Sequence, residues 1–421
     1  MERFEVTGGI PLHGDVRISG AKNAALKLMA ACALTDDACV VRNVPRISDV
    51  AVMRETMSDI GFEIERPEAD TYRIRARDAE WLFVPLEAAA KTRSSFILLG
   101  PLLTRFGRVI ISNPGGDRIG RRPVNLHVEA MCKLGAEIEY KNGYYFARAN
   151  RLRGATIRFP YVTVMGTENA ILGAALASGT TVIENAAREP EVDDLIAMLC
   201  AMGARIERTA PHRLEVEGVD RLHGAEHTVI GDRIEAGTFA IAAAVTGGQL
   251  TLSGVAPGHL GAFLDVLTRI GVPFEADGDG TTIRVCGAGE VRPAEIETQP
   301  YPGFATDLQA PMAVLLTQAS GTSAIHETIY EDRLEYTAEL AKMGARIEVS
   351  DGCHARISGP TPLAAADLQI ADLRAGATLI LAALAARGTS TISGADHVDR
   401  GYERIESKLV GVGAAVTRVD G

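Results

Sequence analysis

The stretch LCAMGARIE, residues 199–207, ends an apolar helical pattern in a glycine and continues as a short alternating strand. A glycine directly after an apolar helix is typical of a C′ residue in the left-handed conformation. We therefore expect a helix to end here and a strand to follow. Five further copies of this pattern are MSDIGFEIE (57–65), MCKLGAEIE (131–139), LTRIGVPFE (267–275), LAKMGARIE (340–348) and LVGVGAAVT (409–417).

The copies recur at a spacing of roughly 70 residues, which is typical of a small βαβ-type subdomain rather than a solenoid repeat. Most units also carry an Ala/Leu-rich helix followed by a turn and a strand, as in LAALAARGTSTISG. Such a helix is apolar nearly all round, so we expect it to be buried. Six units group into two α/β lobes of three, with a hinge near residues 220–231 and a ligand cleft between the lobes.

The bulk composition excludes several classes of protein. A net charge of −11 argues against general nucleic-acid binding. The start MERFEVTGG lacks the apolar core of a signal peptide, and no apolar run is long enough to span a bilayer. We expect a cytoplasmic protein that binds neither membrane nor nucleic acid, and the oligomeric state stays open.

The six cysteines form no CxxC pair and have no metal-ligand spacing with histidine. Cys32, Cys132 and Cys200 fall within apolar helical patterns, where we expect them to act as small core hydrophobes. The chain also lacks a P-loop and a GxGxxG motif after a strand, so ATP and dinucleotide cofactors are not expected.

Charges at the starts of the buried helices indicate where ligands bind. A helix N-terminus favours acidic residues because its dipole is positive there. Lys22, Arg93 and Arg374 break this rule at equivalent places in the repeat. Each one alone could be a solvated or paired base, but together they favour a polyanionic ligand, which backbone N–H groups and the cation would hold together.

The stretch SNPGGDRIGRRPVNLH, residues 112–127, places a double glycine and three arginines around Asp117. Arginine suits phosphate and carboxylate, and glycine lets the backbone approach a ligand. A surface turn with solvated charges is the alternative. Asp307, in PYPGFATDLQAP, is either a helix N-cap or a general base aimed at a substrate hydroxyl.

Seven motifs together resemble the UDP-N-acetylglucosamine 1-carboxyvinyltransferase (MurA) family of enolpyruvyl transferases, from the first strand to the C-terminus. They are ISGAKNAAL, PGGDRIGRRPVNLH, ENAAREPEV, GDRIEAGTF, PGFATDLQA, DLRAGATL and HVDRGYERIE. The resemblance implies two inside-out α/β barrels, each of three βαβαββ units, with the active-site cleft between them. It also implies one domain at 22–229, carrying a mobile loop near 112–123, and a second at 1–21 plus 230–421.

The family reaction moves the enolpyruvyl group of phosphoenolpyruvate to the 3′-hydroxyl of UDP-N-acetylglucosamine and releases phosphate, by addition and elimination. It is the first committed step of peptidoglycan precursor synthesis, which links the family to cell shape and cell division, and it needs no metal or other cofactor. Two alternatives are a paralogous enolpyruvyl transferase acting on another nucleotide and an inactive sensor that binds UDP-N-acetylglucosamine.

The resemblance also implies roles for individual residues. It gives Lys22, Arg122 and Arg400 to the phosphate of phosphoenolpyruvate, and Arg374 with Arg400 to its carboxylate. Asp307 matches the family's base, with Asn23 and Ile329 near the sugar. The remaining contacts to the nucleotide sugar are implied for Arg93, Arg122, Pro123, Val124, Asn125, Leu126, Tyr161, Val162, Thr163 and Val164.

The chain departs from most of the family in the glycine-rich loop, where Asp117 replaces a cysteine. Some members carry aspartate naturally, so the resemblance still implies activity, with Asp117 as the general acid. That role requires a pKa above the ordinary value near 4. Because a carboxylate is a weaker nucleophile than a thiolate, we expect the epoxide fosfomycin, which alkylates the family's cysteine, to inhibit poorly.

Overall fold

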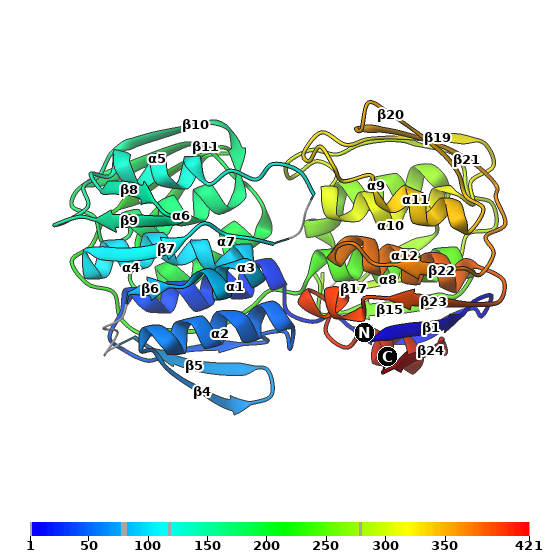
Figure 1. Cartoon of the computed structure of the whole chain (residues 1–421), viewed down its shortest axis with the longest axis horizontal. Helices are drawn as coiled ribbons and strands as arrows, with labels where there is room; N and C mark the ends of the chain where they lie inside the picture. Colours follow the sequence, from blue (N-terminus) through cyan, green and yellow to red (C-terminus); the bar gives the residue numbers. More distant parts are fainter. Residues whose placement is uncertain (1, 77–81, 117–118, 278–279, 421) are drawn as a thin grey trace. The chain divides into compact units, whose positions relative to one another are not determined.

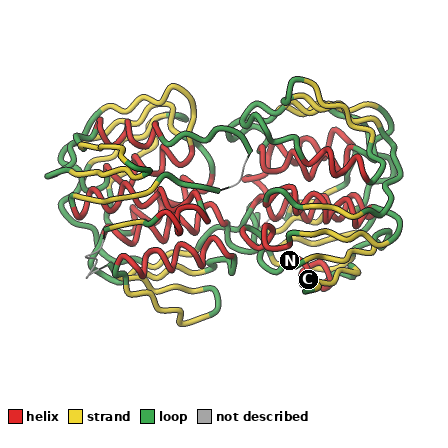
Figure 2. The backbone as a smooth tube through the Cα atoms, in the orientation of Figure 1, coloured by secondary structure: helices red, strands yellow, loops and turns green. Residues whose placement is uncertain are grey.

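The computed structural model describes residues 2–76, 82–116, 119–277 and 280–420. These residues form two compact units. Unit 1 contains 2–19, 119–121 and 231–420, and unit 2 contains 20–116 and 122–230, apart from the undescribed positions. Each unit has its own apolar core, and helices lie inside each unit with strands around them (Figures 1 and 2). The predicted α/β class and the sixfold repeat are confirmed.

Six four-stranded sheets share one strand order, in which the first two strands are parallel and the next two pairings are antiparallel. The sheets of unit 2 are β14 (Glu226–Thr228)-β3 (Cys39–Arg42)-β5 (Thr71–Arg75)-β4 (Glu63–Glu68), β6 (Phe83–Val84)-β7 (Arg108–Ser112)-β9 (Tyr144–Arg148)-β8 (Glu137–Lys141) and β10 (Thr156–Thr163)-β11 (Thr180–Ala186)-β13 (Arg213–Glu217)-β12 (Arg205–Ala210).

The three sheets of unit 1 repeat this order. They are β2 (His13–Arg17)-β15 (Gln249–Ser253)-β17 (Thr282–Cys286)-β16 (Phe274–Ala276), β18 (Glu295–Glu297)-β19 (Thr322–His326)-β21 (His354–Ser358)-β20 (Arg346–Ser350) and β22 (Asp367–Gln369)-β23 (Thr389–Ser393)-β1 (Arg3–Thr7)-β24 (Ala415–Val419). The N-terminal strand β1 therefore completes the last repeat, beside the C-terminal strand (Figure 1).

The helices follow the same repeat, with an inner helix after the first strand and an outer helix after the second. Unit 2 contains α1 (Lys22–Ala31), η1 (Cys32–Leu34), α2 (Ser48–Ile60), α3 (Leu86–Lys91), η2 (Arg93–Leu98), α4 (Leu99–Phe106), α5 (Asn125–Lys133), α6 (Val164–Ala174) and α7 (Pro190–Ala201). Unit 1 contains α8 (Arg233–Thr246), η3 (Pro257–Leu260), α9 (Gly261–Ile270), α10 (Thr306–Leu316), α11 (Tyr336–Lys342), α12 (Leu373–Ala385), η4 (Ala395–Arg400) and α13 (Ile405–Gly411).

The glycines of the repeated pattern have the predicted conformation. Their φ angles are positive at all six positions, from 87° at Gly271 to 107° at Gly61. A side chain would strain the backbone there, whereas glycine accepts this conformation at little cost. Each glycine thus ends an outer helix and turns the chain into the next strand of its sheet.

The prediction that the Ala/Leu-rich helices are buried is also confirmed. Nearly every residue of α6, α8, α10 and α12 is buried. Small residues permit this packing: a Cβ at Gly237 of α8 would lie 2.6 Å from Cδ2 of Leu308 in α10. Of the predicted site residues, Lys22, Asp307 and Arg374 lie in the first turns of the inner helices α1, α10 and α12.

Two segments link the units and lie side by side. The backbone N–H of Ala21 donates to the carbonyl of Ile230, and that of Asp232 donates to the carbonyl of Ser19. The strand just before the first link, β2, pairs with β15, and the strand before the second, β14, pairs with β3. Each link therefore joins an edge strand in one unit to an inner helix in the other.

The cysteine prediction is only partly right. Cys32 is buried, but Cys132 and Cys200 are exposed. Both of these lie on the solvent-facing sides of the outer helices α5 and α7, which are buried along one face only. Among the described residues, no helix has both the length and the apolarity needed to cross a membrane.

Candidate active site

In unit 1, the carboxylate of Asp307 lies between two guanidinium groups. Arg333 donates to its Oδ1 at 2.6 Å, and Arg374 donates to its Oδ2 at 2.8 Å. Both arginine side chains are buried, whereas the Asp307 side chain keeps 23% exposure. One carboxylate facing two guanidiniums gives this cluster an excess of positive charge, which favours an anionic ligand.

These contacts also set the protonation state of Asp307. Burial alone would raise the pKa of its carboxyl, but Arg374 and Arg333 together hold that pKa well below its usual range. The carboxylate is therefore ionised, as a general base must be. So low a pKa also makes it a weak proton acceptor while both arginines point at it.

The interpretation of Asp307 as a helix N-cap is wrong. Ala305 is the N-cap of α10, and Asp307 is the second residue of the helix. Its carboxylate bonds the two arginines, and no side-chain hydrogen bond caps this helix end.

Local structure holds both arginines in place. The side chain of Asp372 caps α12 by accepting from the backbone N–H groups of Arg374 and Ala375. The Arg374 guanidinium lies over the ring of Tyr402, 5.4 Å from its centroid. Arg333 also donates to the hydroxyl of Thr306, at 3.2 Å. A cap, a cation–π contact and a hydroxyl thus preorganise the cluster.

The buried carboxylate of Glu327 connects Ile329 to this cluster. It accepts from the backbone N–H of Ile329 at 2.8 Å and from the hydroxyl of Thr306 at 2.7 Å. Arg400 is the last residue of η4. The next residue, Gly401, lies against the start of α12, because a Cβ on Gly401 would lie 2.6 Å from Cδ2 of Leu373. Unit 1 therefore brings Asp307, Ile329, Arg374 and Arg400 into one neighbourhood.

In unit 2, Lys22 is the first residue of α1 and is paired with Asp49 of α2. The Lys22 Nζ lies 2.8 Å from Oδ2 of Asp49, and both residues are buried. The hydroxyl of Thr92 donates to the same oxygen at 3.2 Å. Asn23, next to Lys22, is partly exposed, and its carbonyl accepts from Nζ of Lys27 at 2.6 Å.

Arg93 follows Thr92 and begins η2, a 3-10 helix that leads directly into α4. Its guanidinium donates to the carbonyls of Arg122 and Pro123. A Cβ at Gly116 would lie 3.2 Å from Cβ of Arg93 and 3.9 Å from Nη1 of Arg122. The structure thus brings the double-glycine segment, Arg93 and Arg122 together, as expected for a site that binds anions.

The other predicted residues of unit 2 lie at strand and helix ends. Val124 is the N-cap of α5, and Asn125 and Leu126 are in its first turn. Tyr161, 57% exposed, with Val162 and Thr163, ends β10, and Val164 begins α6. Leu126 and Val124 are buried and belong to the core, so their side chains are less accessible to a ligand than that of Tyr161.

Asp117 and Arg118 lie outside the described residues. Of the same loop, residues 119–121 are grouped with unit 1. The backbone N–H of Arg121 donates to Oε2 of Glu331 at 3.0 Å. Gly120 has a φ of +119°, and a Cβ there would lie 3.0 Å from the backbone nitrogen of Glu331.

The structure gives each basic helix start an internal partner. Lys22 pairs with Asp49, Arg374 pairs with Asp307, and Arg93 bonds two carbonyls. The alternative of structural pairing is therefore true of all three. At Asp307, two guanidiniums share one carboxylate.

Sequence reasoning missed Arg333, Asp49 and Glu327. Asp49 and Glu327 are ordinary acidic residues in their segments, and Arg333 follows a surface-like YED run. Only the packing of α2 against α1, and of the Ile329 segment against α10, reveals their contacts.

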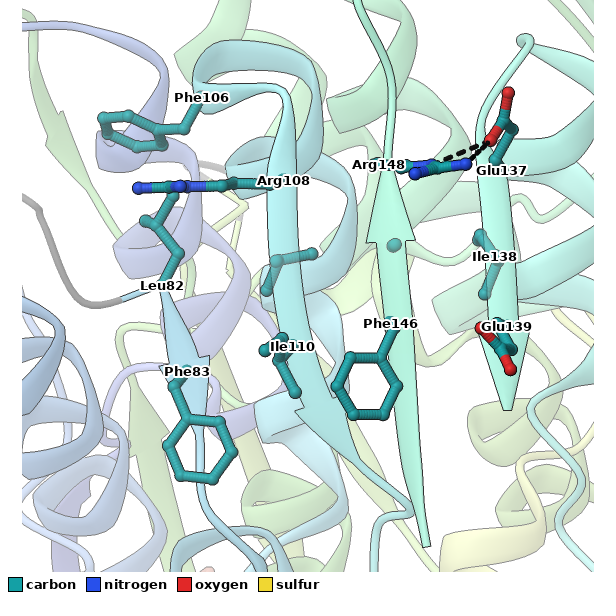
Figure 3. A pocket seen from close by; sticks show the side chains of 12 residues that line it. Leu82, Phe83, Phe106, Arg108, Ile110, Glu137, Ile138, Glu139, Phe146 and Arg148 are labelled. Atoms are coloured by element: carbon teal, nitrogen blue, oxygen red, sulfur yellow. Dashed lines mark hydrogen bonds and ion pairs between the residues drawn. The ribbon is translucent and has the colours of Figure 1, made fainter. Parts of the chain in front are cut away.

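A cavity of unit 2 lies away from these residues. It has a volume of about 1390 Å³ on the outer face of the sheet β6-β7-β9-β8 (Figure 3). Phe83, Ile110 and Phe146 form a row across this face, flanked by Arg108 and Arg148. None of the predicted site residues lines this cavity. In the described part of the chain, no group of three or more His, Cys, Asp or Glu side chains is placed to hold a metal ion.

Comparison with known proteins agrees with the fold class. The sequence profile of the family EPSP synthase (3-phosphoshikimate 1-carboxyvinyltransferase) matches residues 6–409. In fold, the chain resembles the crystal structure of the enolpyruvyl transferase NikO from Streptomyces tendae, with a TM-score of 0.90 at 28% identity over 100% of this chain and 99% of that one. EPSP synthase from Acinetobacter baumannii has the same fold, with a TM-score of 0.78 and full coverage of both chains at 18% identity.

The chain belongs to the EPSP synthase family, a family of enolpyruvyl transferases. Within it, the chain is 45% identical over its whole length to the UDP-N-acetylglucosamine 1-carboxyvinyltransferases of Acidobacterium capsulatum and Solibacter usitatus, covering 96% and 100% of them. It is 46% identical to that of Rhodopseudomonas palustris strain BisB5, again with full coverage of both.

Proposed function

We propose that this protein transfers the enolpyruvyl group of phosphoenolpyruvate to the 3′-hydroxyl of UDP-N-acetylglucosamine and releases phosphate. The observation that carries the proposal is 45% identity along the entire chain to enzymes of that name. The Asp307 cluster supports it, because a carboxylate held by two buried arginines combines a base with an anion site. The reaction is the first committed step of peptidoglycan precursor synthesis.

The proposed mechanism uses positive charge from both units. Lys22, Arg122 and Arg400 hold the phosphate of phosphoenolpyruvate, and Arg374 with Arg400 holds its carboxylate. When Arg374 turns to that carboxylate, Asp307 loses one of the two cations that lower its pKa, and it becomes a better acceptor for the proton of the sugar hydroxyl. The base is thus activated by substrate binding.

We propose that UDP-N-acetylglucosamine is held by residues at strand and helix ends of unit 2, with help from Ile329 of unit 1. They are Asn23, Arg93, Arg122 to Leu126 and Tyr161 to Val164. Asp117 donates the proton to the methylene carbon of phosphoenolpyruvate. The reaction needs no metal or redox cofactor, because its charges are neutralised by these cations.

We further propose that the enolpyruvyl transferase domains are 22–229 and 1–21 plus 230–421. The compact units change over between residues 19 and 20 and between 230 and 231, within two residues of these boundaries, and they differ from the proposed domains in grouping residues 119–121 with unit 1. We propose a cytoplasmic location and no nucleic-acid or membrane partner, in keeping with the net charge of −11.

The test is phosphate release from phosphoenolpyruvate with and without UDP-N-acetylglucosamine, with the sugar product identified by mass. Release that requires the nucleotide sugar and yields its 3′-enolpyruvyl ether is the expected result. Turnover only with a different nucleotide would favour the paralogous transferase, and tight binding of UDP-N-acetylglucosamine without turnover would favour the sensor.

A further inference from the structure

The ammonium group of Lys22 is held in a buried ion pair. Its Nζ lies 2.8 Å from Oδ2 of Asp49, and the two residues are only 8% and 3% exposed. A lysine side chain has four flexible carbons and otherwise samples many rotamers. A buried carboxylate at this distance restricts it to a small region at the start of α1.

Asp49 is itself held in place by two elements. It is the second residue of α2, where the positive end of the helix dipole stabilises a carboxylate. The hydroxyl of Thr92 donates to Oδ2, the oxygen that also faces Lys22. Thr92 is in turn fixed, because its Oγ1 accepts from the N–H of Ser94 and its carbonyl accepts from the hydroxyl of Ser95.

This arrangement connects two predicted ligand groups through one carboxylate. Thr92 directly precedes Arg93, whose guanidinium donates to the carbonyls of Arg122 and Pro123. The chain of contacts therefore runs from Lys22 through Asp49 and Thr92 to the Arg93 backbone. An ammonium group has three donors, so its bond to Asp49 is compatible with further bonds to phosphate oxygens.

We propose that Asp49 is a positioning residue for the reaction, which holds the Lys22 ammonium where the phosphate of phosphoenolpyruvate binds, with Thr92 setting the orientation of its carboxylate. This inference rests on the proposed function. Asp49 acts through Lys22 and does not touch the reacting atoms. Its removal should therefore weaken the use of phosphoenolpyruvate and leave the binding of UDP-N-acetylglucosamine almost unchanged.

The experiment compares full-length wild type with Asp49→Asn and Thr92→Val, both close in shape to the native residues. The readouts are kcat and KM for phosphoenolpyruvate, the Kd of UDP-N-acetylglucosamine and the thermal midpoint. We expect kcat/KM for phosphoenolpyruvate to fall about 10²-fold in Asp49→Asn, as for other misplaced catalytic groups, and less in Thr92→Val. The Kd of the nucleotide sugar should stay within about twofold of wild type.

A matched control is Asp194→Asn in α7. This carboxylate is equally buried in unit 2 and bonds His227 at 2.7 Å, away from the Lys22 contacts. It tests the general cost of removing a buried carboxylate, and it should lower the thermal midpoint without selectively raising KM for phosphoenolpyruvate. Thr92→Val keeps the proposal testable if Asp49→Asn does not fold.

A double-mutant cycle separates positioning from a merely structural role. Because Asp49 acts through Lys22, adding Asp49→Asn to Lys22→Met should change kcat/KM by no more than about twofold. Two results would overturn the positioning role. In the first, wild type turns over and Asp49→Asn has the same kcat/KM as wild type. In the second, Asp49→Asn still lowers kcat/KM in the Lys22→Met background. If wild type itself releases no phosphate, the proposed function fails and the role of Asp49 falls with it.

Discussion

Arg374, in the first turn of α12, donates to Oδ2 of Asp307, in the first turn of α10, at 2.8 Å. Two inner helices of unit 1 thus begin at one ion pair, and Arg333 binds the other carboxylate oxygen. This pairing satisfies two buried cations. In the proposed reaction, it also keeps the base weak until an anion draws Arg374 away.

Replacing Asp307 with Asn should abolish measurable turnover and destabilise the protein. The amide keeps the shape but leaves the buried cations Arg333 and Arg374 without a counter-charge, a change that typically costs about 3–5 kcal/mol. Phosphate release and urea unfolding at pH 7 provide the measurements. Asp399→Asn, which removes a more exposed partner of Arg418, is the control and should retain activity.

The stability difference between wild type and Asp307→Asn should also depend on pH in a defined direction. The folded-state pKa of Asp307 is lowered, so its ionised carboxylate contributes stability above the unfolded-state pKa near 3.9. That contribution is lost as pH falls below about 4. Unfolding measured at pH 7, 5 and 3 should show that the difference in free energy of unfolding between wild type and Asp307→Asn shrinks only at pH 3. A difference that changes between pH 7 and 5 would contradict the lowered pKa of Asp307.

For Glu168, we expect the stability of the protein to depend on pH in the opposite direction. It is fully buried in α6, and burial, together with nearby Glu191 and Glu189, raises its pKa to about 7 despite Lys27 at 3.7 Å. Neither carboxylate oxygen has a hydrogen-bond partner among the described residues. Folding therefore favours the protonated form, and the stability linked to it is lost as pH rises from about 4.5 to 7.

The measurement is the free energy of unfolding of wild type and Glu168→Gln across this pH range. Relative to the variant, which cannot ionise there, wild type should lose on the order of 3 kcal/mol between pH 4.5 and 7. Glu348→Gln, on an exposed strand position, is the control and should follow wild type. Parallel curves for wild type and Glu168→Gln would show that Glu168 has an ordinary pKa.

The loop aspartate predicts resistance to fosfomycin. Asp117 offers a carboxylate where the family resemblance implies a thiol, and a carboxylate attacks an epoxide more slowly than a thiolate does. Wild type should keep its activity during incubation with fosfomycin, and Asp117→Cys should be inactivated with one adduct per chain. Asp117→Asn should lose most activity if this residue is the acid; rapid inactivation of wild type with an adduct on Asp117 would falsify the first part.

Gly120→Ala tests the contact between the loop and Glu331. Gly120 has a φ of +119°, and an added Cβ would meet Glu331. Such strain costs of order 1–3 kcal/mol, so kcat/KM should fall about tenfold or more. Gly143→Ala, also at a positive φ but with open space around it, is the matched control for backbone strain alone. Equal effects of the two substitutions would show that the Glu331 contact contributes nothing.

The repeat could be predicted from the sequence because it depends on local rules. Apolar periodicity sets each helix, and a glycine with positive φ ends it, as at Gly203 and Gly344. The same reasoning found Lys22, Arg93 and Arg374, since a cation at a helix start breaks a local electrostatic rule. Sequence reasoning wrongly predicted that Cys132 and Cys200 are buried. Both lie on outer helices, and which face of such a helix is buried depends on what packs against it.

By itself, the sequence determined the sixfold α/β repeat and, through its motifs, the family. Only the tertiary structure decided which charges meet. Asp307 lies 67 positions before Arg374, and Lys22 lies 27 before Asp49, yet each pair is in direct contact. Such contacts depend on how helices pack against one another, and that packing is set by the shapes of buried side chains far apart along the chain. A local pattern can mark a charged helix start, but it cannot name the partner that will neutralise it.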